Sequence, residues 1–389
     1  MKKTLSIILA LIMVLGLLAG CGQSSTTEAQ TSDAPAVEPA TAKPGEGKKL
    51  GMLQLSAFGI PSMIEAENSI KNLCEYYGIE VVTAPVTGYD DASLIATYEQ
   101  LINEGCNAVS VYTFSEGTIG LLADVFEEAG VNWFLANRHV TDPALIEKVF
   151  ATKMLVGNCY CQEEEVAYDM VCKMADEMGV KNLAVIGLQE GDINGDYRDK
   201  GIARACEEKG ITLLTETRGI ASVDDVTNSI ESIIASYPEL DGIFIVGGAV
   251  TTGALAGASQ ALANHNMSDK VSIAMIDFAT GMGDYMGEGN PLKLVAGGNL
   301  TMDMYLSAAS LVNCLLGENV DDQPYELHTS MMYITSPEEA ADYEEYCENV
   351  DIPLISGESW EKYFIGKSID EIQTFVTNYS IATAKEMRG

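Results

Sequence analysis

Short apolar segments alternate with longer amphipathic segments along most of this chain, and this alternation limits the folds that it can adopt. The predicted strands form two series, 49–55, 79–84, 108–112, 132–136 and 152–157, then 183–188, 212–217, 242–246, 272–276 and 292–297. The helix patterns between them often end at a glycine, as at positions 78, 105, 130, 179 and 210. Repeated strand–helix units predict parallel sheets with right-handed crossovers. We therefore expect an α/β protein with two doubly wound parallel-sheet lobes joined by a hinge.

The two strand series and the composition of the flanking segments divide the chain into parts. Residues after the anchor region are rich in Ser, Thr, Ala, Pro and Glu, which is typical of a disordered linker. The predicted parts are a signal peptide (1–20), a disordered linker (21–48), an N-terminal lobe (49–157 with about 301–330), a C-terminal lobe (158–300), and a C-terminal extension that packs on the lobes (331–389).

The N-terminal segment indicates export. Lys2 and Lys3 precede an apolar run that reaches Leu18, and this run is too short to span a bilayer of about 30 Å comfortably. The sequence Leu-Ala-Gly-Cys that ends at Cys21 resembles the lipobox of bacterial lipoproteins. That resemblance implies cleavage before Cys21 and lipidation of its thiol, whereas the alternative is an ordinary signal peptide with a chance cysteine. We expect an extracytoplasmic protein, lipid-anchored to the outer face of the cytoplasmic membrane.

Charge excludes several classes of partner. The 57 acidic and 22 basic residues give a formal charge of −35. Nucleic acids are bound largely by Lys and Arg, and anionic lipid surfaces attract basic segments, so neither partner is expected. Membrane contact is predicted through the lipid anchor alone. The eight cysteines after Cys21 lie mostly in apolar-periodic stretches, which favours buried, reduced thiols.

No motif in the chain indicates an enzyme. The three histidines have no metal-ligand spacing, and residues 257–261 lack the last glycine of a nucleophile elbow. The glycines of 281–287 depart from the dinucleotide-binding spacing, and the segment beginning at Asp192 departs from an EF-hand loop after its first residues. We interpret these segments as turns or helix starts, and we expect no catalytic residue, metal or cofactor.

The region from Lys49 to about Leu316 resembles the type I periplasmic binding proteins, specifically their ribose-binding-like sugar branch. The order and spacing of six stretches carry the resemblance: LGMLQLSAFGIPSMIEAENSIKNLCEYYGIEVV, WFLANRH, NGDYRDKGIARA, GIFIVGGAVTTGALAGASQAL, SIAMIDF and LVAGGNLT. The resemblance implies a two-lobed clamp that closes by hinge motion on a solute and delivers it to an ABC permease. It also implies that ligand residues follow the strands.

The resemblance maps the binding site of the family onto residues of this chain. Asn137-Arg138 stands where the family often has Asp-Arg, and Arg198 opens an Arg-x-x-Gly element. Met63 occupies a usual aromatic position, and Gly248 belongs to a Gly-Gly pair that replaces the family's Asn-Asp. The predicted substrate-binding residues are Phe58, Met63, Tyr112, Asn137, Arg138, Arg198, Gly248, Asp277 and Asn299.

These residue types suit recognition of a polyol. Asp277 with Arg138 or Arg198 can form charge-assisted hydrogen bonds to vicinal hydroxyls, and Phe58 or Tyr112 can stack on the C–H face of a sugar. Two of these residues have alternative, purely structural interpretations: Arg138 could form a surface ion pair, and Asp277 could cap a helix. The Gly-Gly pair makes the pocket less polar, so a nucleoside or an amino-acid-like molecule remains an alternative solute.

The sequence thus predicts a monomeric solute-binding subunit of an ABC importer for a sugar or sugar-like small molecule, with ABC permease transmembrane subunits as partners. Two other classes remain as alternatives: a ligand-sensing module for a membrane receptor and an exported enzyme on the same scaffold. Turnover of a bound solute would reveal the enzyme.

Overall fold

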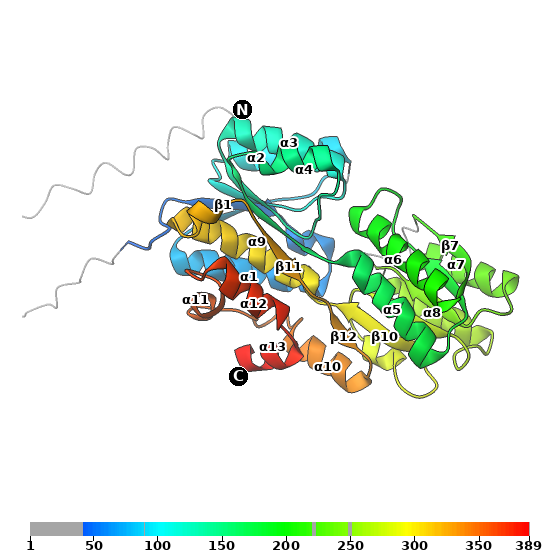
Figure 1. The fold of residues 1–389 in the computed structure, drawn as a ribbon. Helices are drawn as coiled ribbons and strands as arrows, with labels where there is room; N and C mark the ends of the chain where they lie inside the picture. The colour runs from blue at the N-terminus through cyan, green and yellow to red at the C-terminus, as the bar shows by residue number, and fades with distance from the viewer. Residues whose placement is uncertain (1–41, 89, 220–222, 248–250, 389) are drawn as a thin grey trace, which may run out of the picture. The chain divides into compact units, whose positions relative to one another are not determined.

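A computed structural model describes residues 42–88, 90–219, 223–247 and 251–388 (Figure 1). The predicted signal peptide (1–20), the lipidation site Cys21 and most of the predicted linker lie outside the described residues. Residues 42–48, which composition places in the linker, are among the described residues. Residues 43–48 form a turn in which Lys48 N donates to Gly45 O, and Gly45 N donates to Tyr77 O. These hydrogen bonds fix a segment that composition alone assigned to the linker.

The first sheet has six parallel strands in the order β11-β5-β4-β3-β1-β2. Its strands are β1 (Lys49–Leu53), β2 (Glu80–Ala84), β3 (Ala108–Val111), β4 (Asn132–Leu135), β5 (Leu155–Cys161) and β11 (Tyr325–Thr329). Five main helices cover it: α1 (Pro61–Tyr77), α2 (Asp91–Asn103), α3 (Glu116–Ala129), α4 (Pro143–Phe150) and α9 (Asn299–Leu316). Helices α2 to α4 lie on one face, and α1 and α9 lie on the other (Figure 1).

The second sheet also has six strands, in the order β12-β10-β9-β8-β6-β7, and only β12 is antiparallel. Its strands are β6 (Asn182–Ile186), β7 (Thr212–Thr217), β8 (Gly242–Ile245), β9 (Ser272–Ile276), β10 (Leu292–Gly297) and β12 (Met332–Ile334). Four helices flank it: α5 (Glu163–Met178), α6 (Ile193–Lys209), α7 (Val223–Ser236) and α8 (Thr251–Asn264). The predicted α/β class with two doubly wound lobes is therefore confirmed.

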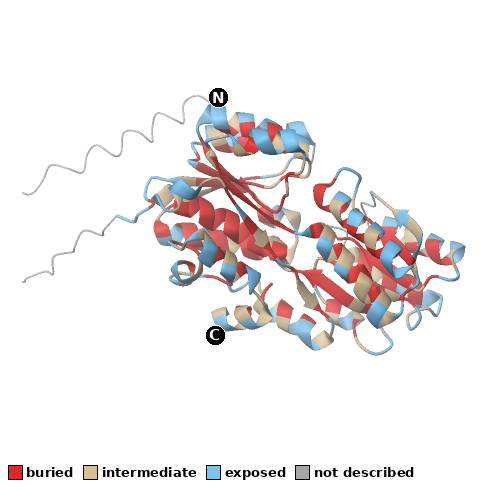
Figure 2. Ribbon diagram, viewed as in Figure 1, coloured by how far each residue is buried: buried red, intermediate tan, exposed pale blue. Residues whose placement is uncertain are grey.

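Burial explains why the strands are almost continuously apolar. Neighbouring residues of one strand point to opposite faces of the sheet. In β8, Phe244 packs in the cluster with α5 and α6, whereas Ile243 and Ile245 pack in the cluster with α7 and α8. Both faces of the sheet are covered, so neither set of side chains can be polar. Figure 2 shows the central strands of both lobes as buried.

Helix ends follow the predicted punctuation. Asp90, Ser115, Asp142 and Asp192 accept hydrogen bonds at the first turns of α2, α3, α4 and α6. The helices α1, α3, α5 and α6 end where a glycine follows in the left-handed conformation. A side-chain oxygen satisfies otherwise unpaired N–H groups, and glycine adopts a positive φ without a Cβ clash. The predicted helix ends at these four glycines are confirmed.

The lobe boundaries differ from those expected from the sequence. Strand β5 continues to Cys161 and pairs with β11 from Gly157 to Cys161, so residues 158–161 belong to the first sheet rather than the second. Residues 332–334 form β12 of the second sheet, although we expected the extension to begin at 331. The chain thus passes between the sheets near residues 162, 298 and 330.

The C-terminal segment contacts both lobes. It contains α10 (Pro337–Tyr346), α11 (Ser359–Tyr363), α12 (Ile369–Thr377) and α13 (Ile381–Arg388). In α10, Glu344 accepts a hydrogen bond from Gly281 N of the second lobe at 2.6 Å. Farther along, Leu354 N donates to Glu65 of α1 at 2.7 Å, and the buried Trp360 packs edge-on against Tyr305 of α9. The segment is therefore part of the folded unit.

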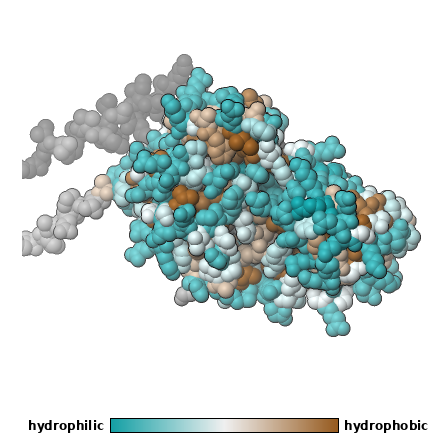
Figure 3. All heavy atoms as spheres, viewed as in Figure 1, coloured by the Kyte–Doolittle hydropathy of each residue, from teal (hydrophilic) through white to brown (hydrophobic). Residues whose placement is uncertain are grey.

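In the view of Figure 3, hydrophilic residues dominate the surface and apolar patches are small. Within the described ranges, no helix combines the length and the apolar character needed to cross a membrane. The eight cysteines of the described chain are free thiols, and six of them are buried, as the apolar periodicity predicted: Cys74, Cys106, Cys159, Cys161, Cys206 and Cys347.

Candidate functional site

A cavity of about 370 Å³ lies between the two sheets, where strands of both lobes end. Its walls come from the segments after β1, β3, β4, β6, β8, β9 and β10 and from the C-terminal segment. Ligands of doubly wound sheets bind beyond the carboxyl ends of the strands. Eight predicted site residues line it: Phe58, Met63, Tyr112, Asn137, Arg138, Arg198, Asp277 and Asn299. The ninth, Gly248, lies outside the described residues.

Two site residues adopt an uncommon backbone conformation. Asn137 follows β4 with φ 59°, and Asp277 follows β9 with φ 73°. Asn and Asp tolerate positive φ better than other residues with a side chain. The resulting bend in the backbone turns each side chain away from its strand and toward the cavity. The position of the site therefore depends on a residue type that tolerates positive φ at these two places. Strained positions of this kind cluster at functional sites.

Arg138 is buried against the first lobe. Its Nε donates to Thr113 O, and its Nη1 donates to Asn137 O at 2.6 Å. The guanidinium lies over the ring of Tyr112, 4.5 Å from the ring centroid, and 5.5 Å from that of Phe114. Hydrogen bonds and aromatic faces together hold its plane in one orientation. The side chain is therefore a fixed donor at the cavity wall rather than a surface ion pair.

Arg198 is held by groups of the second lobe. Its Nε lies 2.7 Å from Glu163 Oε2, and its Nη1 donates to Val246 O at 2.6 Å. Both charged side chains are almost fully buried. Burial raises the pKa of Glu163, and the adjacent Arg198 acts against that rise. Arg198 therefore has a structural partner in addition to its place at the cavity.

A buried carboxyl group orients the two amides of the site. Asp303 accepts hydrogen bonds from Asn137 Nδ2 at 2.7 Å, from Thr329 Oγ1 at 2.8 Å and from Asn299 Nδ2 at 3.5 Å. Burial raises the pKa of Asp303 to about 7. Since the amide nitrogens face Asp303, the amide oxygens face away from it. Asn299 Oδ1 has no hydrogen-bond partner among the described residues, and neither has Thr301 Oγ1 nearby.

Aromatic and aliphatic groups form the remaining walls. Tyr112 makes edge contacts with Phe58 and Phe114, with ring centroids 6.1 Å and 5.3 Å apart. On another side, the rings of Phe278 and Tyr343 lie 3.8 Å apart. The cavity is therefore lined by both polar and aromatic side chains.

Several cavity residues were not identified from the sequence. The sequence indicates only a turn or a helix start at Asp192 and Asn194; Asp192 does cap α6, and both side chains also line the cavity. Thr301 lies two residues after the predicted Asn299, in the first turn of α9. Tyr343 and Glu348 come from the C-terminal segment, where no local pattern indicates a ligand. Asp192 and Thr301 both follow a strand, and this position in the sequence is the feature that could have indicated them as cavity residues.

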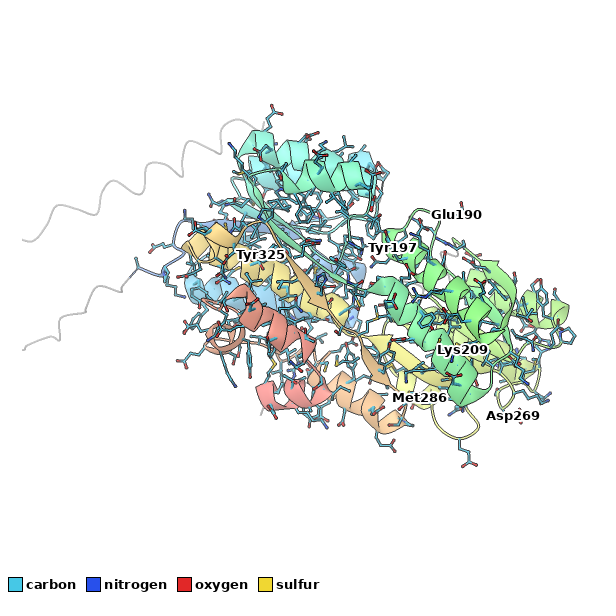
Figure 4. All side chains as sticks on the ribbon, viewed as in Figure 1. Glu190, Tyr197, Lys209, Asp269, Met286 and Tyr325 are labelled. Carbon is cyan, nitrogen blue, oxygen red and sulfur yellow. The ribbon has the colours of Figure 1, made fainter. Side chains whose placement is uncertain are left out.

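The two lobes touch at the cavity. Asn194 Nδ2 donates to Asn137 Oδ1 at 3.2 Å, and Ile193 N donates to Phe114 O at 3.4 Å. Tyr197, labelled in Figure 4 on the part of α6 next to the first lobe, lies 5.8 Å from the ring of His139. The start of α6 therefore closes on loops of the first lobe.

Comparison with known proteins identifies the family. Residues 53–318 match the periplasmic binding protein domain. This chain belongs to that family. The family consists of extracytoplasmic solute-binding proteins rather than enzymes, as the sequence resemblance predicted. A search of the curated proteins finds no match.

Solved structures agree with this fold. A solute-binding protein of an ABC transporter from Bacillus halodurans, with bound myo-inositol, is 17% identical with TM-score 0.62, over 77% of this chain and 98% of that one. A protein from Actinobacillus succinogenes with bound D-allose is 17% identical with TM-score 0.63, over 76% and 100%. A 5-methylthioribose-binding protein from Thermotoga lettingae is 14% identical with TM-score 0.62, over 90% and 99%.

Proposed function

We propose that this chain captures a sugar or sugar-like small molecule between its lobes and delivers it to the permease of an ABC importer. The observation that carries the proposal is that one cavity is lined both by side chains that can form hydrogen bonds and by aromatic rings. Arg138, Asn299 and Thr301 line the same space as Phe58, Tyr112 and Phe278. A sugar offers hydroxyl groups to the former and C–H faces to the latter.

The size of the cavity and the similar structures support a small solute. About 370 Å³ lies in the lower part of the range of roughly 300–1,000 Å³ that is usual for small-molecule sites. The three similar structures described above hold myo-inositol, D-allose and 5-methylthioribose. All three solutes carry several hydroxyl groups. A nucleoside or an amino-acid-like solute is the alternative, and thermal unfolding with each class of solute distinguishes it from a sugar.

Closure and membrane attachment are part of the proposal. The chain passes between the lobes at three short segments, near residues 162, 298 and 330, which is the arrangement a hinge requires. Binding of a solute to both lobes favours the closed state over the open one. The Leu-Ala-Gly-Cys sequence at 18–21 supports a lipid on Cys21 that tethers the protein to the outer face of the membrane.

Thermal unfolding in the presence of candidate solutes tests this proposal. The chain from residue 22 onward is heated with panels of monosaccharides, nucleosides and amino acids. A solute that binds only the native state stabilises it by about 2.7 kcal/mol at one hundred times its Kd. We expect the unfolding temperature to rise with monosaccharides. A rise with nucleosides or amino acids alone would contradict the choice of solute, and no rise with any member would contradict the proposed function.

A further inference from the structure

The cavity carries more acidic than basic groups. Asp192, Asp277 and Glu348 line it, whereas Arg138 and Arg198 are its only basic lining residues in the described chain. Two further carboxyl groups touch lining residues from behind: Glu163 contacts Arg198, and Asp303 contacts Asn137. Five carboxyl groups therefore stand against two guanidinium groups. A buried carboxyl group without a basic partner keeps its proton unless a cation binds beside it.

The imbalance is concentrated at Glu348. Arg198 is paired with Glu163, and Arg138 and Arg198 both feel the negative charge of Asp192. Glu348, by contrast, forms no ion pair with any described Lys or Arg. The charges acting on it are those of acids: Glu344 on its own segment, Asp277 across the cavity and Glu65 of α1.

Glu348 is buried, and its hydrogen bonding is incomplete. Its side chain is 9% exposed, and its one hydrogen bond in the described chain is accepted by Oε1 from Tyr343 Oη at 3.1 Å. A carboxylate has four acceptor positions on two oxygens. Burial, with the neighbouring acids, raises the pKa of Glu348 to about 8. A bound cation would oppose that rise, since an opposite charge favours the ionised form.

Aromatic rings stand beside this carboxyl group. Tyr343, which donates to Glu348, is packed against Phe278, and both rings line the cavity. The faces of aromatic rings attract cations, more strongly where water is excluded. A carboxylate without a basic partner and two adjacent aromatic rings are groups that can bind an ammonium ion. Glu348, Phe278 and Tyr343 are all distant from Arg138 in the sequence. Tyr343 and Glu348 also lie outside residues 53–318, the region that matches the family.

We infer that the solute is an aminated sugar or polyol whose protonated amine binds to Glu348 beside Phe278 and Tyr343. The inference rests on the proposed function, because it names the class of sugar that the same cavity takes. The hydroxyl groups of this solute face Arg138, Asn299 and Thr301. A zwitterionic amino acid would bring an additional negative charge into a cavity that already has more carboxyl than guanidinium groups. A neutral sugar would bring no cation to Glu348.

Matched pairs of sugars test the inference. Binding to the chain from residue 22 onward is measured by calorimetry for D-glucose and D-glucosamine, D-galactose and D-galactosamine, and D-mannose and D-mannosamine. We expect the aminated member of at least one pair to bind about 10-fold or more tightly than its neutral partner. The same measurement is repeated for Glu348→Gln, which retains an acceptor for Tyr343. Loss of a charged hydrogen bond predicts binding of the aminated sugar about 10- to 100-fold weaker.

A matched variant makes the same charge change away from the cavity. Glu345→Gln removes the same charge from an exposed position of α10 and is expected to leave both affinities unchanged. A preference for neutral sugars overturns the inference and leaves the proposed function standing. An amine preference that survives Glu348→Gln overturns the assignment of Glu348. Binding of no member of any pair overturns the inference, whereas the proposed function stands or falls with the thermal unfolding panel. If Glu348→Gln does not fold, the preference of the unmodified chain alone decides between amine and neutral sugar.

Discussion

At the scale of single residues, the site is built from side chains whose direction the protein has fixed in advance. Asp303 accepts from the amide nitrogens of Asn137 and Asn299, which fixes the direction of both amide groups; the Asn137 oxygen in turn accepts from Asn194. Arg138 is held by two backbone carbonyls and by the ring of Tyr112. Groups that are already oriented lose little entropy when a solute binds. A site of this kind is expected to discriminate between solutes through the positions of their hydroxyl groups.

The residue-scale prediction concerns Asp277. Replacing Asp277 by Asn removes the negative charge but keeps a residue that tolerates the φ of 73°. The fold should persist, because Arg198 retains Glu163 as its partner. Loss of a charge-assisted hydrogen bond should weaken solute binding about 10- to 100-fold. Calorimetric titration with the monosaccharide that stabilises the chain most strongly measures the change.

The matched control for this variant is Asp284→Asn, the same change at an exposed position of the short helix η2 (Met282–Tyr285). It should bind the monosaccharide as the unmodified chain does. If Asp277→Asn also bound it with unchanged affinity, Asp277 would have no part in recognition, and the binding site would lie elsewhere.

At the scale of elements, one glycine sets the spacing of two helices in the second lobe. Gly201 lies in the middle of α6, where a Cβ would overlap the carbonyl oxygen of Glu164 in α5 and lie 2.9 Å from Tyr168 N. Because the two backbones approach so closely, Arg198, one turn earlier in α6, reaches Glu163 at the start of α5. The Arg-x-x-Gly element therefore joins a packing requirement to a charged group of the site.

The element-scale prediction is that Gly201→Ala destabilises the protein. Overpacking usually costs about 1–3 kcal/mol, which exceeds the gain of up to about 1 kcal/mol from the better helix propensity of Ala. Gly117→Ala in α3 serves as the control, since the nearest atom to its Cβ would be 3.7 Å away. Denaturant unfolding should give a lower free energy for Gly201→Ala and an equal or higher one for Gly117→Ala. Equal stability of both variants would refute the packing role of Gly201.

Local sequence patterns predicted the helices and strands well, but they predicted the boundaries of the lobes less well. Capping residues and terminal glycines act within one helix turn, so the ends of α1, α3, α5 and α6 follow from the sequence. The last residues of β5 depend on pairing with β11, more than 160 positions later, which no local pattern contains.

The same distinction applies to the candidate site. Asn137, Asp277 and Asn299 follow strands, so fold class and resemblance together indicated their positions. Glu348 approaches the cavity because α10 packs on the second lobe and Leu354 is fixed to Glu65 of the first. This is a tertiary arrangement of a segment that the family match does not cover. The roles of all these residues in binding stay predictions.

At the scale of the whole molecule, contacts between the lobes decide how solute binding and closure are linked. Two hydrogen bonds join the lobes, from Asn194 to Asn137 and from Ile193 to Phe114. A typical hydrogen bond contributes about 1 kcal/mol net to stability. These contacts alone are too weak to hold the lobes together permanently, so a solute that contacts both lobes shifts the population toward the closed state. Apparent affinity then depends on the fraction of molecules that can close.

The last prediction separates closure from direct contact with the solute. Tyr197 does not line the cavity, but its ring lies 5.8 Å from that of His139 in the other lobe. An aromatic pair is worth about 0.5–1.5 kcal/mol, so Tyr197→Ala should speed dissociation of the best-bound monosaccharide about 2- to 10-fold. Tyr168→Ala is the control, because Tyr168 contacts Glu208 and Arg204 within its own lobe. Stopped-flow displacement measures both rates. Equal dissociation rates for the two variants would mean that the lobes separate without breaking the Tyr197–His139 contact, and that closure is controlled by the solute alone.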